Sequence, residues 1–490
     1  MMGKSKKTQP KLFYHGLSLE QRMPKDDPLR KIKKLIDFDF IRSQVADLYG
    51  NNGNQSVDPA IILKLMFLLF YENVTSERAL MRKLPLRMDW LWFCDYDLDE
   101  ETPDHSVLSK ARKRWGADVF EQFFINILKQ CISAGLVDGE TIYIDSSTID
   151  ANADIGKARP QLRKVTEELT DKLEEISKPG QDELTEENSG QDKVEKAVSP
   201  ADPDARIGRK YGKSTLGYKD HRVVDDKHGV ITATISTPAN RNDSNVLKQA
   251  VHTHQANTAT KVRTVTADKI YGTFENYKFL NNKGSKACIP HPRYGCRKVG
   301  KFSYDMFKYD KHDDCFVCPA GQKLLRYNHK KPDDGRWRYH IEREVCQGCK
   351  FFSRCITSKT RGRQVSRNLN AEYVEWADGC LSRHERKQLM SRRQYKVEGS
   401  FANAANNHGF KRARWRGLDM VQIQNNMIAA IQNIGKLLRY VGADGKLTSA
   451  AMSTKAFFKD IARVLHRLFS IYAMYERILS YQRAKPVYSG

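Results

Sequence analysis

A change in the period of the apolar residues near residue 141 constrains the fold of this chain more than any other feature. Before it, the apolar run Ala60–Tyr71 follows an Asp-Pro pair, which is typical of a helix start. After it, Ile142–Ile144 is apolar and Val262–Ala267 is rich in Val and Thr; each short segment is followed directly by an aspartate, as expected of buried strands. Helices followed by alternating strands and helices predict an α/β domain behind a helical N-terminal domain.

The rest of the chain fits the same layout. Strands are expected at 218–224, 230–236 and 287–290, and helices at 244–255, 273–281, 419–438 and 454–482. The predicted domains are a helical N-terminal DNA-binding domain (1–135), a catalytic domain in two parts (136–300 and 376–440), an acidic helical or disordered insert (155–205), a Cys-rich insert (301–375) and C-terminal helices (441–490).

The net charge of +24 over 490 residues indicates a polyanionic partner, and nucleic acid is the commonest one. A soluble protein that is merely basic is the alternative. No apolar run approaches the roughly 20 residues that a membrane-spanning helix needs, and no signal peptide is evident at the N-terminus. We therefore expect a cytoplasmic protein, nucleoid-associated when bound to DNA, whose ten cysteines stay reduced.

Three acids are candidates for metal-dependent phosphodiester chemistry. Asp145 and Asp268 follow predicted strands, and Glu398 lies in a basic helix. Converging carboxylates suit Mg²⁺, which prefers hard oxygen ligands and can serve both the attacking and the leaving oxygen of a phosphate. Taken singly, each has an ordinary alternative, as a capping aspartate at a strand end or as an ion-pair partner within a helix.

Together, these acids lie in motifs that resemble the DDE transposases of bacterial insertion sequences. The motifs run in the family's order between about residues 30 and 440. They are Tyr143–Ile149, Gly217–His221, Thr237–Asp243, Thr266–Tyr271, Val397–Phe401, Asn407–Phe410 and Arg414–Leu418. The cysteine-rich insert is similar to that of the group numbered eleven-eighty-two.

The resemblance implies an RNase H-like mixed sheet with flanking helices. Asp145 on the first strand, Asp268 on the fourth and Glu398 on a late helix would hold Mg²⁺ or Mn²⁺. The implied partners are the element's terminal repeats and target DNA, bound by a homodimer. The implied reaction is strand cleavage followed by strand transfer.

The sequence departs from the family pattern at three positions. Ile270 replaces a usual glycine, Ala405 a usual lysine, and Gln394 an arginine usual four residues before the glutamate. A degenerate transposase that binds DNA without cleaving it is therefore the main alternative. A nuclease without strand transfer is a third.

Two further groups carry predictions. Cys315, Cys318, Cys346 and Cys349 form two CxxC pairs that could bind one structural Zn²⁺, with Cys355 as a spare ligand; reduced, metal-free cysteines are the alternative. Basic and aromatic residues around Glu398 are candidate DNA contacts, with Trp415 stacking on a base. These DNA-binding candidates are Arg392, Arg393, Lys396, Lys411, Arg412, Arg414, Trp415 and Arg416.

The N-terminal region offers two more segments of this kind. The turn and second helix after Tyr71 have the rhythm of a helix–turn–helix motif, although a plain helical bundle shares it. A helix that begins near Asp104 carries Lys110, Arg112, Lys113 and Arg114, either as a solvated face or as phosphate contacts.

Overall fold

The computed structural model describes residues 2–3, 18–50, 55–157, 159–160, 197–210, 213–291, 302–327, 335–356 and 362–440. Most of the predicted acidic insert and all of the predicted C-terminal helices lie outside these ranges. None of the described helices is both long and apolar enough to span a membrane.

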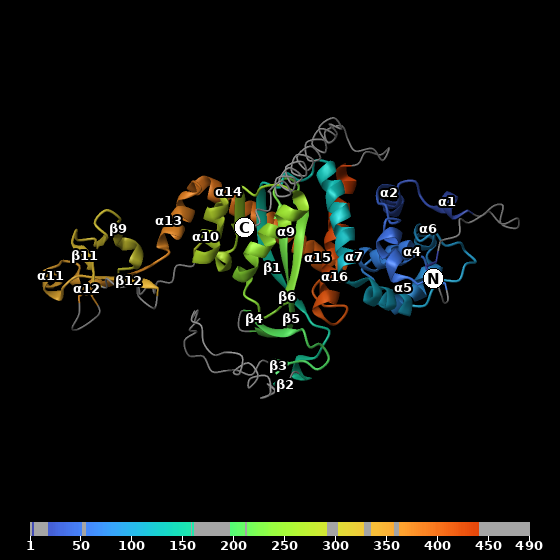
Figure 1. The fold of residues 1–490 in the computed structure, drawn as a ribbon, viewed down its shortest axis with the longest axis horizontal. Helices are drawn as coiled ribbons and strands as arrows, with labels where there is room; N and C mark the ends of the chain where they lie inside the picture. The colour runs from blue at the N-terminus through green and yellow to red at the C-terminus, as the bar shows by residue number, and fades with distance from the viewer. Residues whose placement is uncertain are drawn as a thin grey trace, which may run out of the picture.

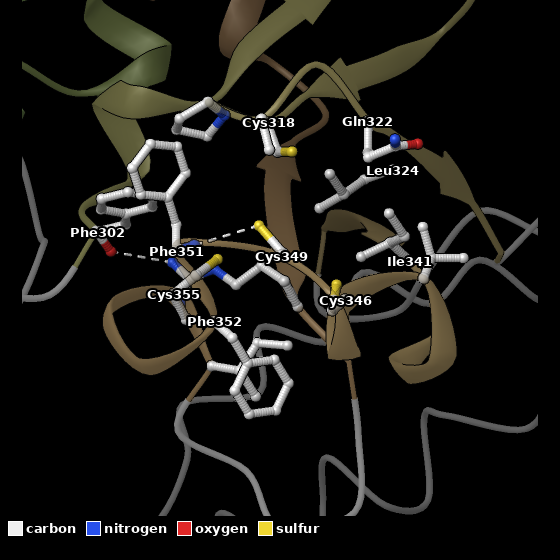
Figure 2. A pocket seen from close by; sticks show the side chains of 15 residues that line it. Phe302, Cys318, Gln322, Leu324, Ile341, Cys346, Cys349, Phe351, Phe352 and Cys355 are labelled. Atoms are coloured by element: carbon white, nitrogen blue, oxygen red, sulfur yellow. Dashed lines mark hydrogen bonds between the residues drawn. The ribbon is translucent and has the colours of Figure 1, made fainter.

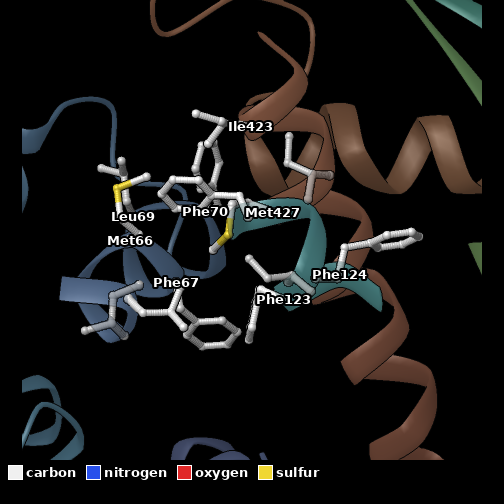
Figure 3. Close-up of a cluster of buried hydrophobic side chains, with 14 of the residues drawn as sticks. Met66, Phe67, Leu69, Phe70, Phe123, Phe124, Ile423 and Met427 are labelled. Carbon is white, nitrogen blue, oxygen red and sulfur yellow. The ribbon is translucent and has the colours of Figure 1, made fainter. Parts of the chain in front are cut away.

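The N-terminal part is helical, as predicted. Its helices are α1 (Leu19–Arg22), α2 (Pro28–Leu35), α3 (Ile41–Val45), α4 (Pro59–Tyr71), α5 (Glu77–Lys83), α6 (Met88–Phe93) and α7 (Ser106–Ser133). The predicted start of α4 is confirmed, because the Asp58 carboxylate accepts the Ala60 N–H and Pro59 occupies the first turn. Helix α4 is buried along nearly its whole length and packs with α7 and α16 (Figure 3).

A mixed sheet forms the centre of the molecule (Figure 1). Its strands are β1 (Thr141–Asp150), β4 (Arg206–Lys210), β5 (Lys213–Asp225), β6 (Ile231–Pro238), β7 (Thr264–Ala267) and β8 (Lys286–Cys288). Strand β5 lies antiparallel between β1 on one side and β6 on the other. Strands β7 and β8 extend the sheet beyond β1 and run parallel to it. The predicted α/β mixed sheet is therefore confirmed.

Helices cover both faces of this sheet, and the two-residue period of β1 separates the faces. Ile142 and Ile144 belong to one core, together with α9 (Leu247–Thr258), α10 (Phe274–Lys283) and α13 (Ala371–Gly379). Tyr143 belongs to the other, with α7, α15 (Gly399–His408) and α16 (Leu418–Tyr440). By the same alternation, Asp145 lies on the Tyr143 face.

Strand β1 is longer than its apolar residues suggest. We predicted that it would end at Asp145, but it continues to Asp150. The polar residues after Asp145 remain in the sheet because β5 pairs with β1 over the whole of 142–150. Strand β7 pairs only with 141–144, so Asp145 marks the place where β1 loses its parallel neighbour.

A second, smaller sheet carries the cysteine-rich segment. It contains β9 (Lys308–Asp310), β10 (Cys315–Val317), β11 (Lys323–Arg326), β12 (Arg336–His340) and β13 (Gln364–Asn368) in sequential antiparallel order. Two short helices, α11 (Arg343–Gln347) and α12 (Phe352–Cys355), lie between β12 and β13. This small sheet and the N-terminal helices lie at opposite ends of the molecule (Figure 1).

A buried arginine joins β5 to the helices on the Tyr143 face. Arg222 and Asp220 form an ion pair with no exposed side-chain surface, at a distance of 2.7 Å. The Arg222 Nη1 donates to Ser400 Oγ in α15 and to Gln432 Oε1 in α16, each at 2.9 Å. Its guanidinium also lies over the rings of Phe401 and Phe410, at 4.6 and 4.8 Å from their centroids.

We expect Arg222→Met to lower the free energy of unfolding by about 3–5 kcal/mol, because it leaves the Asp220 carboxylate buried without its partner. Denaturant unfolding followed by circular dichroism measures this loss. The matched control is Arg263→Met, which removes a pair with Glu140 whose side chains are 73% and 43% exposed. That change should cost no more than about 1 kcal/mol. Equal losses in the two variants would contradict a central role for Arg222.

Candidate active site

Two aspartates meet at the edge of the central sheet. In the parallel pairing of β1 with β7, Ile144 lies opposite Ala267, so Asp145 and Asp268 follow at equivalent positions on neighbouring strands. Each carboxylate accepts the N–H of the next residue, at 2.8 Å for Asp145 and 2.6 Å for Asp268. Both side chains are only partly exposed. The structure thus brings together two of the three acids predicted from the sequence.

An arginine from a late helix reaches the first aspartate. Arg393, the last residue of α14 (Arg383–Arg393), donates from Nη1 to the Asp145 carboxylate at 2.8 Å. Burial raises the pKa of Asp145, Arg393 opposes that rise, and the charge of Asp268 adds to it. The two carboxylates therefore repel each other electrostatically. A cation bound between them and the helix would lower the free-energy cost of burying both charges.

Glu398 lies one π-helical turn after Arg393. Residues 394–398 form a π-helix, η7, between α14 and α15, and η7 packs against β1 and β5. In an α-helix, two residues five apart would differ by about 140° around the axis. A π-turn bonds i to i+5, so it brings Glu398 roughly into line with Arg393. The Glu398 side chain is exposed.

The three acids do not form a closed cluster. Among the described residues, no group of three or more His, Cys, Asp or Glu side chains lies close enough to hold a metal ion. The structure thus places Asp145 and Asp268 side by side and Glu398 on the neighbouring helix, with its carboxylate directed to solvent.

Asp226 anchors the helix that carries Glu398. It accepts hydrogen bonds from Tyr143 Oη at 2.6 Å, Lys396 Nζ at 2.8 Å and Arg392 Nη1 at 3.1 Å. Lys396 and Arg392, both predicted as DNA contacts, are therefore ion-paired with the turn after β5. Nothing local in the sequence indicates this long-range role of Asp226.

Asp243 is a further acid beside Asp145 that we did not single out from the sequence. It accepts from Ser146 Oγ at 2.8 Å and pairs with Lys219 Nζ at 2.7 Å. The signal that could have identified it is its place at the end of the Thr237–Asp243 motif. Asp243 therefore links Ser146 on β1 to Lys219 on the neighbouring strand β5.

Two predicted DNA contacts in the basic segment, Arg414 and Trp415, are partly buried and contact the N-terminal helices. Arg414 donates to the carbonyl oxygen of Val74 and lies over the Phe70 ring, at 4.5 Å. Trp415 packs edge-on against Phe70 at 5.7 Å, and the Arg112 guanidinium covers its ring at 3.8 Å. Both side chains therefore pack the segment after α15 against the N-terminal helices, and the Arg112 guanidinium covers one face of the Trp415 ring.

Arg112 and Arg393, which were also candidates for DNA contacts, are buried and form ion pairs within the protein. Arg112 is buried, paired with Glu77 and stacked on Trp415, whereas Lys110, Lys113 and Arg114 are exposed on α7. Arg393 is 8% exposed and serves Asp145. Lys411, Arg412 and Arg416 are exposed, as a phosphate contact requires. Lys411 also donates to Ser147 Oγ at 2.8 Å, which places this segment beside β1.

Four cysteines gather in the smaller sheet. Cys318, Cys346, Cys349 and Cys355 line one cavity (Figure 2). Burial raises the pKa of the Cys346 and Cys355 thiols, and the neighbouring cysteines raise it further. Cys355, which was predicted to be a spare metal ligand, therefore lies around the same cavity as the other three cysteines.

Cys315 does not line this cavity, which changes the predicted ligand set. It lies in β10, where it pairs with Leu325 and Asp310 on the flanking strands. Two residues three apart on an extended strand point to opposite faces, so Cys315 points away from the face used by Phe316 and Cys318. The two cysteines of a CxxC pair can bind one ion when the chain turns between them. Between Cys315 and Cys318 the chain is instead the extended strand β10.

Two family models match this chain. A transposase domain (DUF772) matches residues 17–114, and a transposase DDE domain matches residues 317–438. The second match begins at the end of β10, contains the rest of the cysteine-rich sheet together with Arg393 and Glu398, and ends within α16. No curated protein matched the chain. The matches define a DNA-processing enzyme of the transposase class. The chain belongs to the DDE transposases of insertion sequences.

The position of Trp415 leads to a prediction that separates packing from base stacking. We expect Trp415→Ala to cost about 3 kcal/mol of unfolding free energy, since it empties the contact between Phe70 and Arg112. Trp415→Phe, which keeps a ring there, should cost much less. Filter binding of the two variants to DNA should give the same salt dependence as the parent. A normally stable Trp415→Ala protein with weakened DNA binding would restore the base-stacking interpretation.

Proposed function

We propose that this transposase cleaves DNA strands at the ends of its element and joins the freed 3′-hydroxyl to target DNA. The observation that carries the proposal is that Asp145 and Asp268 lie at equivalent positions of adjacent parallel strands, where β7 ends beside β1, with the helix of Arg393 and Glu398 packed next to them. Paired carboxylates on a rigid sheet, open to solvent on one side, suit a phosphodiester substrate that must be held in line.

The side chains at this edge fit divalent metal ions of the Mg²⁺ type. Asp145 and Asp268 offer oxygen ligands, and the raised pKa of Asp145 reflects a buried charge that a cation would stabilise. When bound, such ions neutralise the phosphate and activate the attacking oxygen. Glu398 would complete the ligand set from the helix. Asp226, through Lys396 and Arg392, would hold that helix in place against β1.

The π-turn helps to decide between an active transposase and a degenerate one that binds DNA without cleaving it. Relatives of this family carry an arginine four residues before the glutamate, and here Gln394 stands there while Arg393 is five residues before it. A π-turn adds one residue to a helix, so Arg393 takes the angular position that the fourth residue has in an α-helix. Its ion pair with Asp145 supports this equivalence, which favours an active enzyme over a purely DNA-binding one.

DNA would approach along the basic surface next to β1. Lys411, Arg412 and Arg416 are exposed there, and Lys411 lies within hydrogen-bonding distance of Ser147 on β1. Helix α7 presents Lys110, Lys113 and Arg114, which would contact phosphates farther along the duplex. In this scheme the helices of residues 1–135 are the DNA-binding domain, and a homodimer would hold the two ends of the element.

The first test replaces each acid by its amide. Asp145→Asn, Asp268→Asn and Glu398→Gln should reduce cleavage of an end-containing duplex to background, because each removes one ligand charge with little change in volume. DNA binding and folding should stay near those of the parent. The control is Asp150→Asn, an exposed acid on the same strand as Asp145, which should cleave normally. Cleavage retained in any one of the three variants would remove that residue from the site.

The second test concerns the basic surface. Each phosphate contact contributes about 0.9 to the slope of log affinity against log salt concentration. We expect Arg412→Ala and Arg416→Ala each to weaken DNA binding and to flatten that slope by about this amount. Lys248→Ala, an exposed lysine on α9, is the control and should leave the slope unchanged. Two variants with the slope of the parent would place the DNA elsewhere.

A further inference from the structure

Four thiols from separate parts of the smaller sheet surround one cavity of about 30 Å³. Cys318 follows β10, Cys346 lies on α11, Cys349 follows α11, and Cys355 ends α12. Figure 2 shows these side chains around a common space, with Phe302, Leu324 and Ile341 forming part of its apolar wall. The cavity can hold a single small species.

Tight turns already place these cysteines in the manner of metal-binding knuckles. The Cys318 N–H donates to the Gln322 carbonyl, and the Gly321 N–H donates back to the Cys318 carbonyl, both at 2.9 Å. Gly321 has φ +83, which only a glycine adopts readily. At the second turn the Cys349 N–H donates to the Cys346 carbonyl at 3.0 Å, and the Phe351 N–H donates to Cys349 Sγ at 3.4 Å.

The small sheet also needs a cross-link that its core does not supply. Its apolar cluster has only seven buried residues: Phe302, Phe307, Phe316, Leu324, Tyr339, Ile341 and Val365. Modules of this size are usually stapled by disulfides or by a metal ion. None of the described cysteines is in a disulfide. A cation, Arg363, lines the same cavity and donates to the Cys355 carbonyl at 3.1 Å, so positive charge is at hand to offset a cluster of thiolates.

We propose that Cys318, Cys346, Cys349 and Cys355 bind one structural Zn²⁺ and that Cys315 is not a ligand. The four thiols would release four protons as the ion binds, leaving a site with a net charge of 2−. Four sulfur ligands leave no open position, so the ion has no catalytic role. As described, the sulfurs are wider apart than ligands of one ion. Binding would therefore draw the segment from Cys346 to Cys355 toward Cys318 and stiffen the sheet.

The experiment is zinc analysis of the full-length protein, purified under reducing conditions without chelator. The parent and Cys315→Ala should each carry about one zinc per chain, whereas Cys355→Ala should carry none. Cobalt substitution gives a second readout, since four thiolates around Co²⁺ produce the visible absorption of a tetrahedral site. Cys355→His supplies another zinc ligand and should recover the metal, which separates loss of a ligand from loss of folding.

Several outcomes would overturn the proposal. They are a parent without zinc, zinc retained in Cys355→Ala, and zinc lost from Cys315→Ala while circular dichroism shows it folded. If Cys315→Ala does not fold, Cys315→Val fills the same buried position and repeats the test. None of these measurements uses DNA or the carboxylates at the central sheet. Their failure would therefore leave the proposed strand-cleavage activity untouched.

Discussion

The position of the helix that carries Glu398 depends on the buried guanidinium of Arg222. A charge without exposed surface is costly unless its hydrogen bonds and its counter-charge are supplied. Here Asp220 supplies the charge, Ser400 and Gln432 supply acceptors, and two phenylalanine rings cover the faces. These partners come from β5, α15, the turn after α15 and α16. Arg222 keeps these contacts only if all four elements hold their places, and Glu398 is two residues from Ser400.

Near the two aspartates, basic side chains of one helical segment form ion pairs with acids of the central sheet and of the turn after β5. Arg393 faces Asp145, while Lys396 and Arg392 on the same helical segment face Asp226. Both sets of contacts come from residues within the π-turn or just before it. A regular α-helix could not keep Arg393 on Asp145 and also align Glu398 with it, so the π-turn reconciles the anchoring of the helix with the direction of its glutamate.

Periodicity and caps predicted β1 and β5 to β8 of the central sheet and the helices α4, α9, α10 and α16, because these depend on neighbours in the sequence. The apolar residues of Ile142–Ile144 and the Asp58-Pro59 pair are local signals of this kind. The errors concern partners far along the chain. Strand β1 runs past Asp145 because β5 pairs with it, and Cys315 leaves the cysteine cluster because two strands flank it. Trp415 was predicted to stack on a base, whereas Phe70 and Arg112, more than 300 residues earlier in the sequence, pack against it.

These distant contacts also decide how the N-terminal helices relate to the candidate active site. Helices α4 and α7 share one apolar core with α16 and with Val397, the residue before Glu398. Arg414 and Trp415 lock the segment between α15 and α16 onto the loop after α4. The N-terminal helices are therefore not an appendage on a flexible linker. If they bind DNA as we propose, the duplex is held at a fixed orientation to Asp145 and Asp268, and correct positioning of the reacting phosphate is the largest contribution that a rigid scaffold can make to such a reaction.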